Sequence, residues 1–593
     1  MAKKNTYKQD ERLEEPFDIR HLLLASSYIK KYLGKMVFAL LLSALGGGIA
    51  LFAPILSQKA IDTAIPDKNV RYLLWLGIML IGVYVVSIIF TTIRSRMMIK
   101  VSQNIIYDIR KDLFAHLQKL PFQYYDDRPH GKILIRVVNY VNSVSDMLSN
   151  GLINVVLEMI NLLLIVIFML AVDVQMSLVV MCGVPILAAF MFWIKNRQRK
   201  AWQMVSNKNS NLNAYLQENI VGARITQIFA REDENAKIFA GLSDDCRHTW
   251  MHAVRCNNLV WPGIDAISVC IRAAIFIFGM VLFGQGSKTI GTIVAISSYS
   301  SRFWQPIMNM GNIFNNFLNN MAYLERIFET LGEPVTVDNA PDAIEMPPIK
   351  GAVSFKNVSF SYEPGKEILH NVSFDIKPGM SVALVGPTGA GKSTIVNLIS
   401  RFYNIDSGEI SIDGQDISKV TLSSLRSQMG IMMQDSFLFS GTIRDNILYG
   451  KLDSTDVEIK RASELVCADG FISSMPDGYL TEVKERGSLL SQGQKQLISF
   501  ARTLLSDPAI LILDEATSSI DVQTEKALQK GLNSMLKGRT SFIIAHRLST
   551  IRNCDLIIYI DNGGIVEAGT HDELMAKKGS YFQLYTSQLE DIA

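Results

Sequence analysis

Six apolar stretches run through the N-terminal half of the chain. Each is long enough to cross a bilayer as an α-helix, which needs roughly 20 residues. Three contain no charged residue, namely Met36–Leu56, Tyr72–Ile93 and Val174–Ile194. The others contain one or two, namely Met147–Val172 with Glu158, Leu259–Phe283 with Asp265 and Arg272, and Thr289–Leu324 with Arg302. The pattern predicts a domain of six transmembrane helices.

The connections between these stretches differ in length and charge. Two long connections, Arg94–Arg136 and Lys195–Arg247, are rich in lysine and arginine, whereas the three others are short and hold few basic residues. Because basic residues concentrate on the cytoplasmic side, a multi-pass protein of the cell inner (cytoplasmic) membrane is predicted, with both termini in the cytosol. The long connections keep a helical period, so we expect the spans to continue as helices into the cytosol. Before the first span, Phe17–Lys35 is amphipathic and is predicted to form a helix on the inner membrane surface.

Composition agrees with a chain that is partly in the membrane. Its 593 residues suggest at least two domains, and 49% apolar residues stand beside 19% charged ones. The formal net charge is only +2 and no basic block dominates, so nothing indicates nucleic-acid binding. The six cysteines show no C-x-x-C pair and no metal-ligand spacing, and we expect them to be reduced packing residues.

The second half follows a proline-rich, acidic segment without period, GEPVTVDNAPDAIEMPPIK at 332–350, which is predicted to be a linker. Alternating stretches after it, AVSFKNVSFSY and VSFDI, predict strands. Tyr362 ends the first of these stretches, where its ring is well placed to stack on an adenine.

A glycine-rich loop then follows an apolar strand at Val382–Val385. The loop and the helix start after it consist of Gly386, Pro387, Thr388, Gly389, Ala390, Gly391, Lys392, Ser393 and Thr394. The spacing G-x-x-x-x-G-K-[ST] between a strand and an amphipathic helix is typical of a phosphate-binding loop. Its backbone N–H groups can converge on phosphate oxygens, and the helix N-terminus adds partial positive charge. We therefore predict a nucleotide site, with Lys392 on the outer phosphates and Ser393 on Mg²⁺.

A second aliphatic strand, AILILDEA, ends in two carboxylates. Asp514 is expected to hold Mg²⁺ through water, and Glu515 to polarise the attacking water as general base. Two acids at a strand end are a weak signal alone, but they become strong beside the phosphate-binding loop upstream.

Taken together, these motifs resemble those of a half-size ABC exporter, and the resemblance covers essentially the whole chain. It implies a multidomain protein in which a six-span α-helical transmembrane domain with long cytosolic extensions precedes an α/β P-loop ATPase domain. The expected boundaries are 1–35 (N-terminus and elbow helix), 36–331 (transmembrane), 332–350 (linker) and 351–593 (ATPase). The matching elements are Tyr362 (adenine-stacking loop), Gly386–Thr394 (Walker A), Gln434 (Q-loop), Leu490–Gln494 (signature), Asp514–Glu515 (Walker B), Ser518–Asp521 (D-loop) and His546 (switch histidine).

The resemblance implies that two ATPase domains close head-to-tail around ATP and Mg²⁺. Each ATP then lies between one chain's Walker A and the signature of the other, which here comprises Ser491, Gln492, Gly493 and Gln494. Asp521 belongs to the D-loop, His546 would hold the γ-phosphate, and Gln434 would link Mg²⁺ to short docking helices. The segments LPFQYYDDRPHGKILIRVVN and QENIVGARITQIFARED resemble the two intracellular loops that carry such helices. A single chain cannot complete this arrangement, so a second half-transporter chain is the predicted partner, in a lipid bilayer.

The signature departs from the usual LSGGQ, because Gln492 replaces the first glycine, and Lys484 stands where glycine is common. In heterodimeric bacterial multidrug exporters, one chain often keeps the catalytic glutamate and carries an altered signature. This chain resembles that kind, so a heterodimer with this chain as the catalytic half is favoured. A homodimer remains the alternative.

The cargo is not determined by these motifs. Small amphipathic or drug-like compounds are favoured, with a lipid flippase or a peptide exporter of the same fold as the runner-up and a non-transporting membrane ATPase as a further alternative. Charges inside a bilayer usually face a bundle interior or a wet cavity. Arg272, Arg302, Phe303 and Trp304 are therefore candidate substrate contacts, although charged residues here could equally serve helix assembly.

Overall fold

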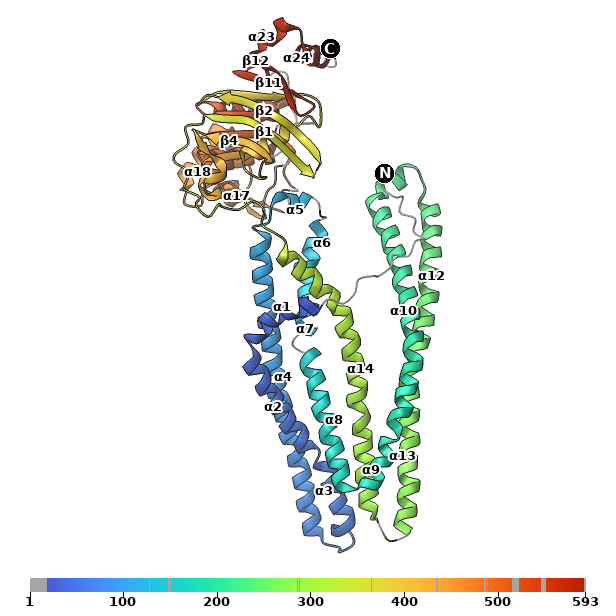
Figure 1. Ribbon diagram of the computed structural model, residues 1–593. Helices are drawn as coiled ribbons and strands as arrows, with labels where there is room; N and C mark the ends of the chain where they lie inside the picture. Colours follow the sequence, from blue (N-terminus) through green and yellow to red (C-terminus); the bar gives the residue numbers. More distant parts are fainter. Residues whose placement is uncertain are drawn as a thin grey trace. The chain divides into compact units, whose positions relative to one another are not determined.

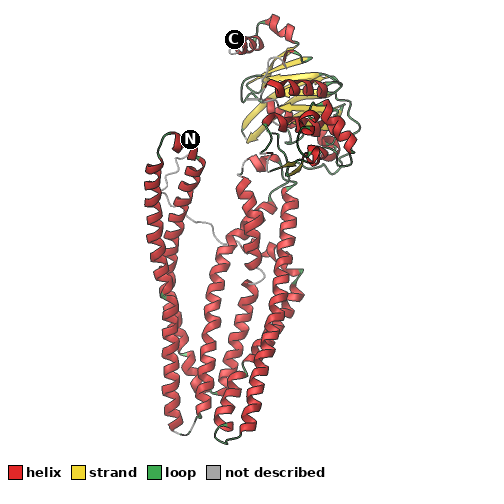
Figure 2. Ribbon diagram, turned by 180° about the vertical axis from the view of Figure 1, so that it is seen from behind, coloured by secondary structure: helices red, strands yellow, loops and turns green. Residues whose placement is uncertain are grey.

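A computed structural model describes residues 19–590, apart from 127, 129, 148–150, 285, 287, 364, 433–435, 485–486, 488, 515–521 and 545–550. The chain forms two compact units (Figures 1 and 2). The first contains the chain up to Leu117 and Gly131–Gly332, and the second contains Gln118–His130 and Glu333–Ala593. The short segment Gln118–His130 thus belongs to the second unit although it lies between helices of the first in the sequence.

The described residues of the first unit form helices joined by short turns, and no strand lies among them. Long helices dominate it, and α4 (Val70–Leu117), α10 (Gly183–Val221) and α14 (Ile290–Gly332) have 48, 39 and 43 residues. The other elements are α1 (Ile19–Lys30), α2 (Leu33–Ala50), α3 (Ala53–Lys59), η1 (Ala60–Ala64), α6 (His130–Ile135), η2 (Arg136–Tyr140), α7 (Val141–Asp146), α8 (Leu152–Val172), α9 (Val174–Met181), α11 (Ala223–Ile228), α12 (Glu232–Asn258) and α13 (Val260–Gly284).

The helical period predicted for the long connections is confirmed, because the helices run on from the apolar stretches into these connections. Both α4 and α10 extend far past the apolar stretches that begin them, and α10 packs along α12 (Figure 1). Prolines explain two local breaks: Pro54 stands in the first turn of α3, and Pro185 lies just after α10 begins. Proline lacks an N–H and is best tolerated at such helix starts.

Five of the six predicted spans are confirmed by length and composition. Among the described residues, the segments apolar enough to cross a membrane are Leu33–Ala64, Val70–Leu117, Asn154–Val172, Val174–Val221 and Glu232–Gly284. The sixth predicted span lies in α14, which is one continuous helix but is not among these five. Serine, asparagine and glutamine interrupt its apolar residues, so a sixth crossing stays a prediction.

The second unit is built on two main sheets. An antiparallel sheet has the order β2-β1-β4-β5, formed by β1 (Val353–Glu363), β2 (Lys366–Ile376), β4 (Ser407–Ile412) and β5 (Gln415–Asp416). The larger sheet has the order β12-β11-β3-β10-β9-β6, formed by β3 (Ser381–Val385), β6 (Met429–Met432), β9 (Ile510–Asp514), β10 (Thr540–Ile544), β11 (Leu556–Asp561) and β12 (Gly564–Gly569). A short pair, β7 (Gly441–Thr442) and β8 (Glu482–Val483), completes the described strands.

Strand β3 shows why this sheet is buried on both faces. Val382 and Leu384 belong to one hydrophobic cluster, whereas Ala383 and Val385 belong to another. Side chains of a strand alternate between faces, so an uninterrupted apolar strand must be covered on both sides. The antiparallel sheet lies on the first side, and helices cover the second (Figure 2).

The second unit also contains the following helices. Besides α5 (Phe122–Asp126), they are α15 (Lys392–Ile399), η4 (Ile417–Lys419), α16 (Leu422–Arg426), α17 (Ile443–Leu448), α18 (Asp456–Leu465), α19 (Asp469–Ser473), η5 (Gly478–Leu480), α20 (Gln492–Leu505), α21 (Val522–Leu536), α23 (His571–Lys577) and α24 (Ser580–Glu590).

Candidate nucleotide site

The carboxyl ends of four adjacent parallel strands lie along one edge of the larger sheet. Strands β3, β10, β9 and β6 are neighbours and all run in the same direction. The phosphate-binding loop follows β3, and Asp514 ends β9. Ligands of open α/β sheets bind at this edge, so the fold gathers motifs that are far apart in the sequence.

Three glycines give the phosphate-binding loop its conformation. Gly386, Gly389 and Gly391 have φ angles of 147°, 85° and 105°, which L-residues with side chains rarely adopt. A Cβ atom on Gly386 would stand 2.0 Å from the Ile560 carbonyl oxygen, and one on Gly391 would stand 2.7 Å from Leu369 Cδ2. The backbone of the loop therefore passes close to Ile560 and Leu369. Pro387, Thr388 and Gly389 at the tip of the loop are exposed.

Lys392 begins α15 and is buried, with only 9% of its surface exposed. Its Nζ donates to the carbonyl oxygens of Gly386 and Pro387, both at 2.8 Å. Burial lowers the pKa of this ammonium group, and the charge of Asp514 opposes the shift. The loop thus holds a desolvated cation beside exposed backbone, which suits the phosphates of ATP.

Two of the three residues expected to bind Mg²⁺, Ser393 and Asp514, are described in the structure, and both suit that role. Ser393 is exposed beside the loop, and Asp514 stands half-buried where β9 ends. A hydroxyl and a carboxylate are the hard oxygen donors that Mg²⁺ prefers. Gln434, Glu515, Asp521 and His546 lie outside the described residues, and so does Ser518.

Tyr362 lies half-buried at the end of β1, next to the phosphate loop. Its hydroxyl donates to Thr394 Oγ1 at 3.3 Å, and its ring packs edge-on against Tyr403 with 5.0 Å between centroids. The ring therefore stands beside the phosphate-binding helix, and its stacking on adenine remains a prediction.

Helix α5 docks against this same region of the ATPase unit. Gln123 Nε2 donates to the Tyr362 carbonyl oxygen at 3.1 Å, and the Tyr403 hydroxyl donates to Asp126 Oδ2 at 2.6 Å. The rings of Phe122 and Phe402 have centroids 4.4 Å apart. The docking helix expected in LPFQYYDDRPHGKILIRVVN is thus confirmed. It is hydrogen-bonded to Tyr362, whose hydroxyl in turn contacts Thr394 after the phosphate-binding loop.

The signature residues form the N-terminus of α20. Ser491 Oγ accepts from the Gln494 N–H at 3.2 Å, while Gln494 Oε1 accepts from the Ser491 N–H at 2.9 Å, which is a capping box. Ser491 and Gln492 are exposed, whereas Gly493 is buried. A helix N-terminus with an exposed hydroxyl can receive a phosphate, and Gln492 presents its longer side chain in the same place. Lys484 is exposed nearby in the sequence.

A clamp that the motifs do not reveal joins α20 to the segment that follows the Q-loop. Arg502 donates from Nε to the Asn446 carbonyl oxygen at 2.7 Å and from Nη2 to Asn446 Oδ1 at 2.8 Å. Its Nη1 donates to the Phe437 carbonyl oxygen at 2.9 Å. Asn446 in turn accepts from the Phe439 N–H at 2.9 Å. Burial lowers the pKa of this guanidinium, yet every nitrogen has a partner.

Replacing Arg502 with alanine should destabilise the ATPase unit. The change removes the donor of the part-buried Asn446 carbonyl oxygen and of the exposed Phe437 carbonyl oxygen, and loss of hydrogen bonds to a charged group should cost about 2–4 kcal/mol. We expect a melting temperature lower by about 5–10 °C in thermal unfolding of the purified transporter. Arg461→Ala on the exposed face of α18 is the control, and equal melting of both variants would remove the clamp from this role.

The candidate substrate residues lie in the helical unit. Arg302 donates from Nη1 to the Ala50 carbonyl oxygen at 3.0 Å and from Nη2 to the Tyr84 hydroxyl at 3.1 Å, so it ties α14 to α2 and α4. Phe303 and Trp304 are buried in a hydrophobic cluster, each with 3% of its surface exposed. Arg272 is half-buried on α13. Helix packing uses three of these four side chains, and their contact with substrate stays a prediction.

Comparison with known proteins agrees with this architecture. Residues 36–307 match the ABC transporter transmembrane region and residues 369–518 match the ABC transporter family. The chain is 42% identical over 584 residues to the uncharacterized ABC transporter ATP-binding protein YknV of Bacillus subtilis, covering 98% of this chain and 97% of that protein. It is 37% identical to the putative multidrug export ATP-binding/permease protein YgaD of Bacillus subtilis, covering 95% and 98% of the two chains.

The structure resembles that of a bacterial Atm1-family ABC exporter with ATP bound. The TM-score is 0.78 at 29% identity, and the match covers 94% of this chain and 98% of the other. Exporters of this fold act as dimers in a membrane and hydrolyse ATP. The chain belongs to the family of ABC exporters and is an ATP-binding, ATP-hydrolysing membrane transporter subunit.

Proposed function

We propose that the chain exports small amphipathic or drug-like compounds across the cytoplasmic membrane, with its ATPase unit and both termini in the cytosol. The position of α5 supports coupling of ATP hydrolysis to transport, and relatives named as multidrug exporters support the cargo class. The segment comes between two helices of the membrane unit in the sequence, yet it docks on the ATPase unit beside Tyr362 and Tyr403. Movement of the ATPase unit on ATP binding would therefore pull directly on the membrane helices.

The proposed catalytic steps combine the described residues of the sheet edge with residues whose roles the family resemblance implies. Lys392 and the loop amides would hold the outer phosphates. Ser393, Asp514 and Gln434 would hold Mg²⁺, whose charge would partly neutralise the phosphates. Glu515 would orient and deprotonate the attacking water, and His546 would contact the γ-phosphate. Closure of two ATPase units on ATP would turn the membrane helices outward, and hydrolysis would reset them.

We propose further that the partner is a different chain. Each ATP site borrows its signature from the opposite subunit, so Lys392 and Glu515 would face the partner's signature, and Gln492 would face the partner's Walker A. The partner would then carry LSGGQ and lack the glutamate after its Walker B aspartate. The altered signature supports this assignment, since Gln492 is exposed at the N-terminus of α20.

Expression of this chain alone tests the heterodimer. We expect the purified chain to show little substrate-stimulated ATPase activity and no transport in vesicles, and both to appear when the partner is co-expressed. As a control, Gln492→Gly restores the usual signature, and it should raise the activity of a homodimer if one forms. Stable homodimers of the unchanged chain with full transport would defeat the heterodimer and leave the export function standing.

The alternative cargo classes are lipids and peptides. Vesicles loaded with a fluorescent drug, a labelled lipid or a labelled peptide separate these alternatives by which compound moves in an ATP-dependent way. Normal ATP hydrolysis without movement or stimulation by any of them would favour a membrane ATPase that does not transport.

A further inference from the structure

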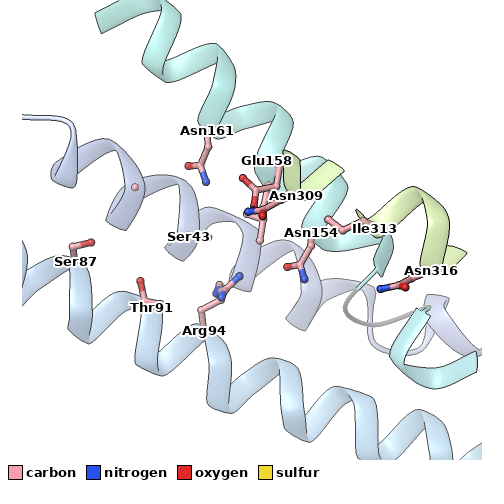
Figure 3. A pocket seen from close by; sticks show the side chains of 12 residues that line it. Ser43, Ser87, Thr91, Arg94, Asn154, Glu158, Asn161, Asn309, Ile313 and Asn316 are labelled. Carbon is pink, nitrogen blue, oxygen red and sulfur yellow. The ribbon is translucent and has the colours of Figure 1, made fainter. Parts of the chain in front are cut away.

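A polar cavity of about 470 Å³ lies inside the helical unit, between α2, α4, α8 and α14 (Figure 3). Nine of its twelve lining residues are polar or charged, including four asparagines. Such groups are costly near hydrocarbon and are kept where water or a ligand reaches them. The volume falls in the range of roughly 300–1,000 Å³ that is usual for small-molecule sites.

Two opposite charges face this cavity. Arg94 enters it from α4 and Glu158 from α8, on opposite sides of the space between the helices (Figure 3). The Nε atom of Arg94 is buried and has no hydrogen-bond partner among the described residues. An unpaired buried guanidinium donor is unfavourable, and a phosphate or carboxylate is the group that its planar fork binds best.

Glu158 is oriented but not saturated. Its Oε1 accepts from Asn309 Nδ2 on α14 at 2.7 Å. A carboxylate can accept about four hydrogen bonds, so this single bond fixes its direction and leaves capacity for a further donor. An ammonium group is the donor that complements both its charge and that remaining capacity.

The cavity lies toward one end of the spans that line it. Arg94 directly follows the predicted span Tyr72–Ile93 and opens the basic connection, and Glu158 lies in the first half of the predicted span Met147–Val172. Basic connections mark the cytoplasmic side, so the predicted topology puts the cavity in the cytoplasmic half of these spans. An amphiphile could place its head here while its chain stays in the bilayer.

We propose that this cavity binds the head group of an amphiphile in which a phosphate or carboxylate lies next to an amine. The anion pairs with Arg94, and the ammonium pairs with Glu158. A purely anionic or purely cationic head group satisfies only one side and leaves the other charge unmatched. This assignment rests on the proposed export function and narrows its cargo to zwitterionic compounds.

Three amphiphiles with one hydrocarbon chain each test the roles of the two charges separately. They are the zwitterion lysophosphatidylethanolamine, the anion lysophosphatidic acid and the amine dodecylamine. The binding of each to the purified transporter in nanodiscs is measured without ATP. The wild type should bind the zwitterion most tightly. Arg94→Gln should weaken binding of the zwitterion and of the anion about tenfold or more, and it should leave binding of the amine unchanged. Glu158→Gln keeps an acceptor for Asn309. It should weaken binding of the zwitterion and of the amine, but not binding of the anion.

Matched variants guard against a general effect. Arg96→Gln and Glu218→Gln remove exposed charges from α4 and α10, and both should bind every probe like the wild type. Arg94→Lys keeps the positive charge and should retain anion binding within a few-fold. Variants that bind all three probes with wild-type affinity would overturn the proposal, and so would a wild type without preference for the zwitterion.

Two further measurements separate the possible failures and the possible sources. Normal export of drugs with no head-group dependence would refute the cavity alone, whereas head-group-dependent binding without ATP-driven movement of any compound would refute export alone. Competition by soluble glycerophosphoethanolamine would indicate a free zwitterion, and binding only of the acyl compound would indicate a lipid. Either result supports the shared zwitterionic chemistry.

Discussion

ATP turnover should fall about a hundredfold or more when Glu515 is replaced by glutamine, while ATP still binds. The change removes the carboxylate that would deprotonate the attacking water, but it leaves Lys392 and the phosphate-binding loop intact. Steady-state ATPase activity and ATP affinity of the purified transporter are the two measurements. A dimer held closed by unhydrolysed ATP should accumulate in the variant.

The control for this variant is Glu464→Gln, which removes an exposed carboxylate from α18 in the same unit. It should change neither turnover nor affinity. Turnover of the Glu515 variant within a few-fold of the wild type would show that another group activates the water. A parallel loss of ATP affinity would instead indicate a folding or binding defect.

The elements that could be predicted are those whose cause is local. The loop from Gly386 to Gly391 needs glycines because the backbone passes within contact of Ile560 and Leu369, and that need appears directly as spacing in the sequence. The alternation of Val382 to Val385 between two hydrophobic clusters likewise follows from an uninterrupted apolar strand. Long apolar runs gave five membrane-spanning segments for the same reason.

The elements that could not be predicted depend on partners far away in the chain. The order β3-β10-β9-β6 brings the motifs to one edge, but no single strand encodes its neighbours. The contact of Gln123 with Tyr362 spans 239 positions, and only the family resemblance suggested a docking helix there. In the sequence, nothing distinguishes Arg502 from other polar residues of its helix, and its role depends on hydrogen bonds to the distant Asn446.

The membrane unit shows the same division. Arg302, Phe303 and Trp304 stood out as a charge among aromatics, and the structure uses them mainly to pack and join helices. In the sequence, Arg94 is only the first residue of a basic connection, and Glu158 is the single charge of a predicted span. Their shared cavity depends on how four helices are arranged, which periodicity along one helix does not specify.

Replacing Lys392 with alanine should weaken ATP binding itself, by about ten- to a hundredfold. The ammonium group is buried beside the loop, where a charge-assisted hydrogen bond to phosphate is stronger than in water. Its Nζ donates to two loop carbonyl oxygens, so the loop itself positions the ammonium group and little side-chain entropy should be lost when it contacts a phosphate. Titration of the purified variant with a fluorescent ATP analogue measures the affinity. Lys377→Ala, an exposed lysine in the turn between β2 and β3, is the matched control and should bind like the wild type. Normal affinity of the Lys392 variant would contradict the phosphate-binding assignment, whereas weak affinity with an unchanged melting temperature would establish that the lysine acts on the nucleotide and not on the fold.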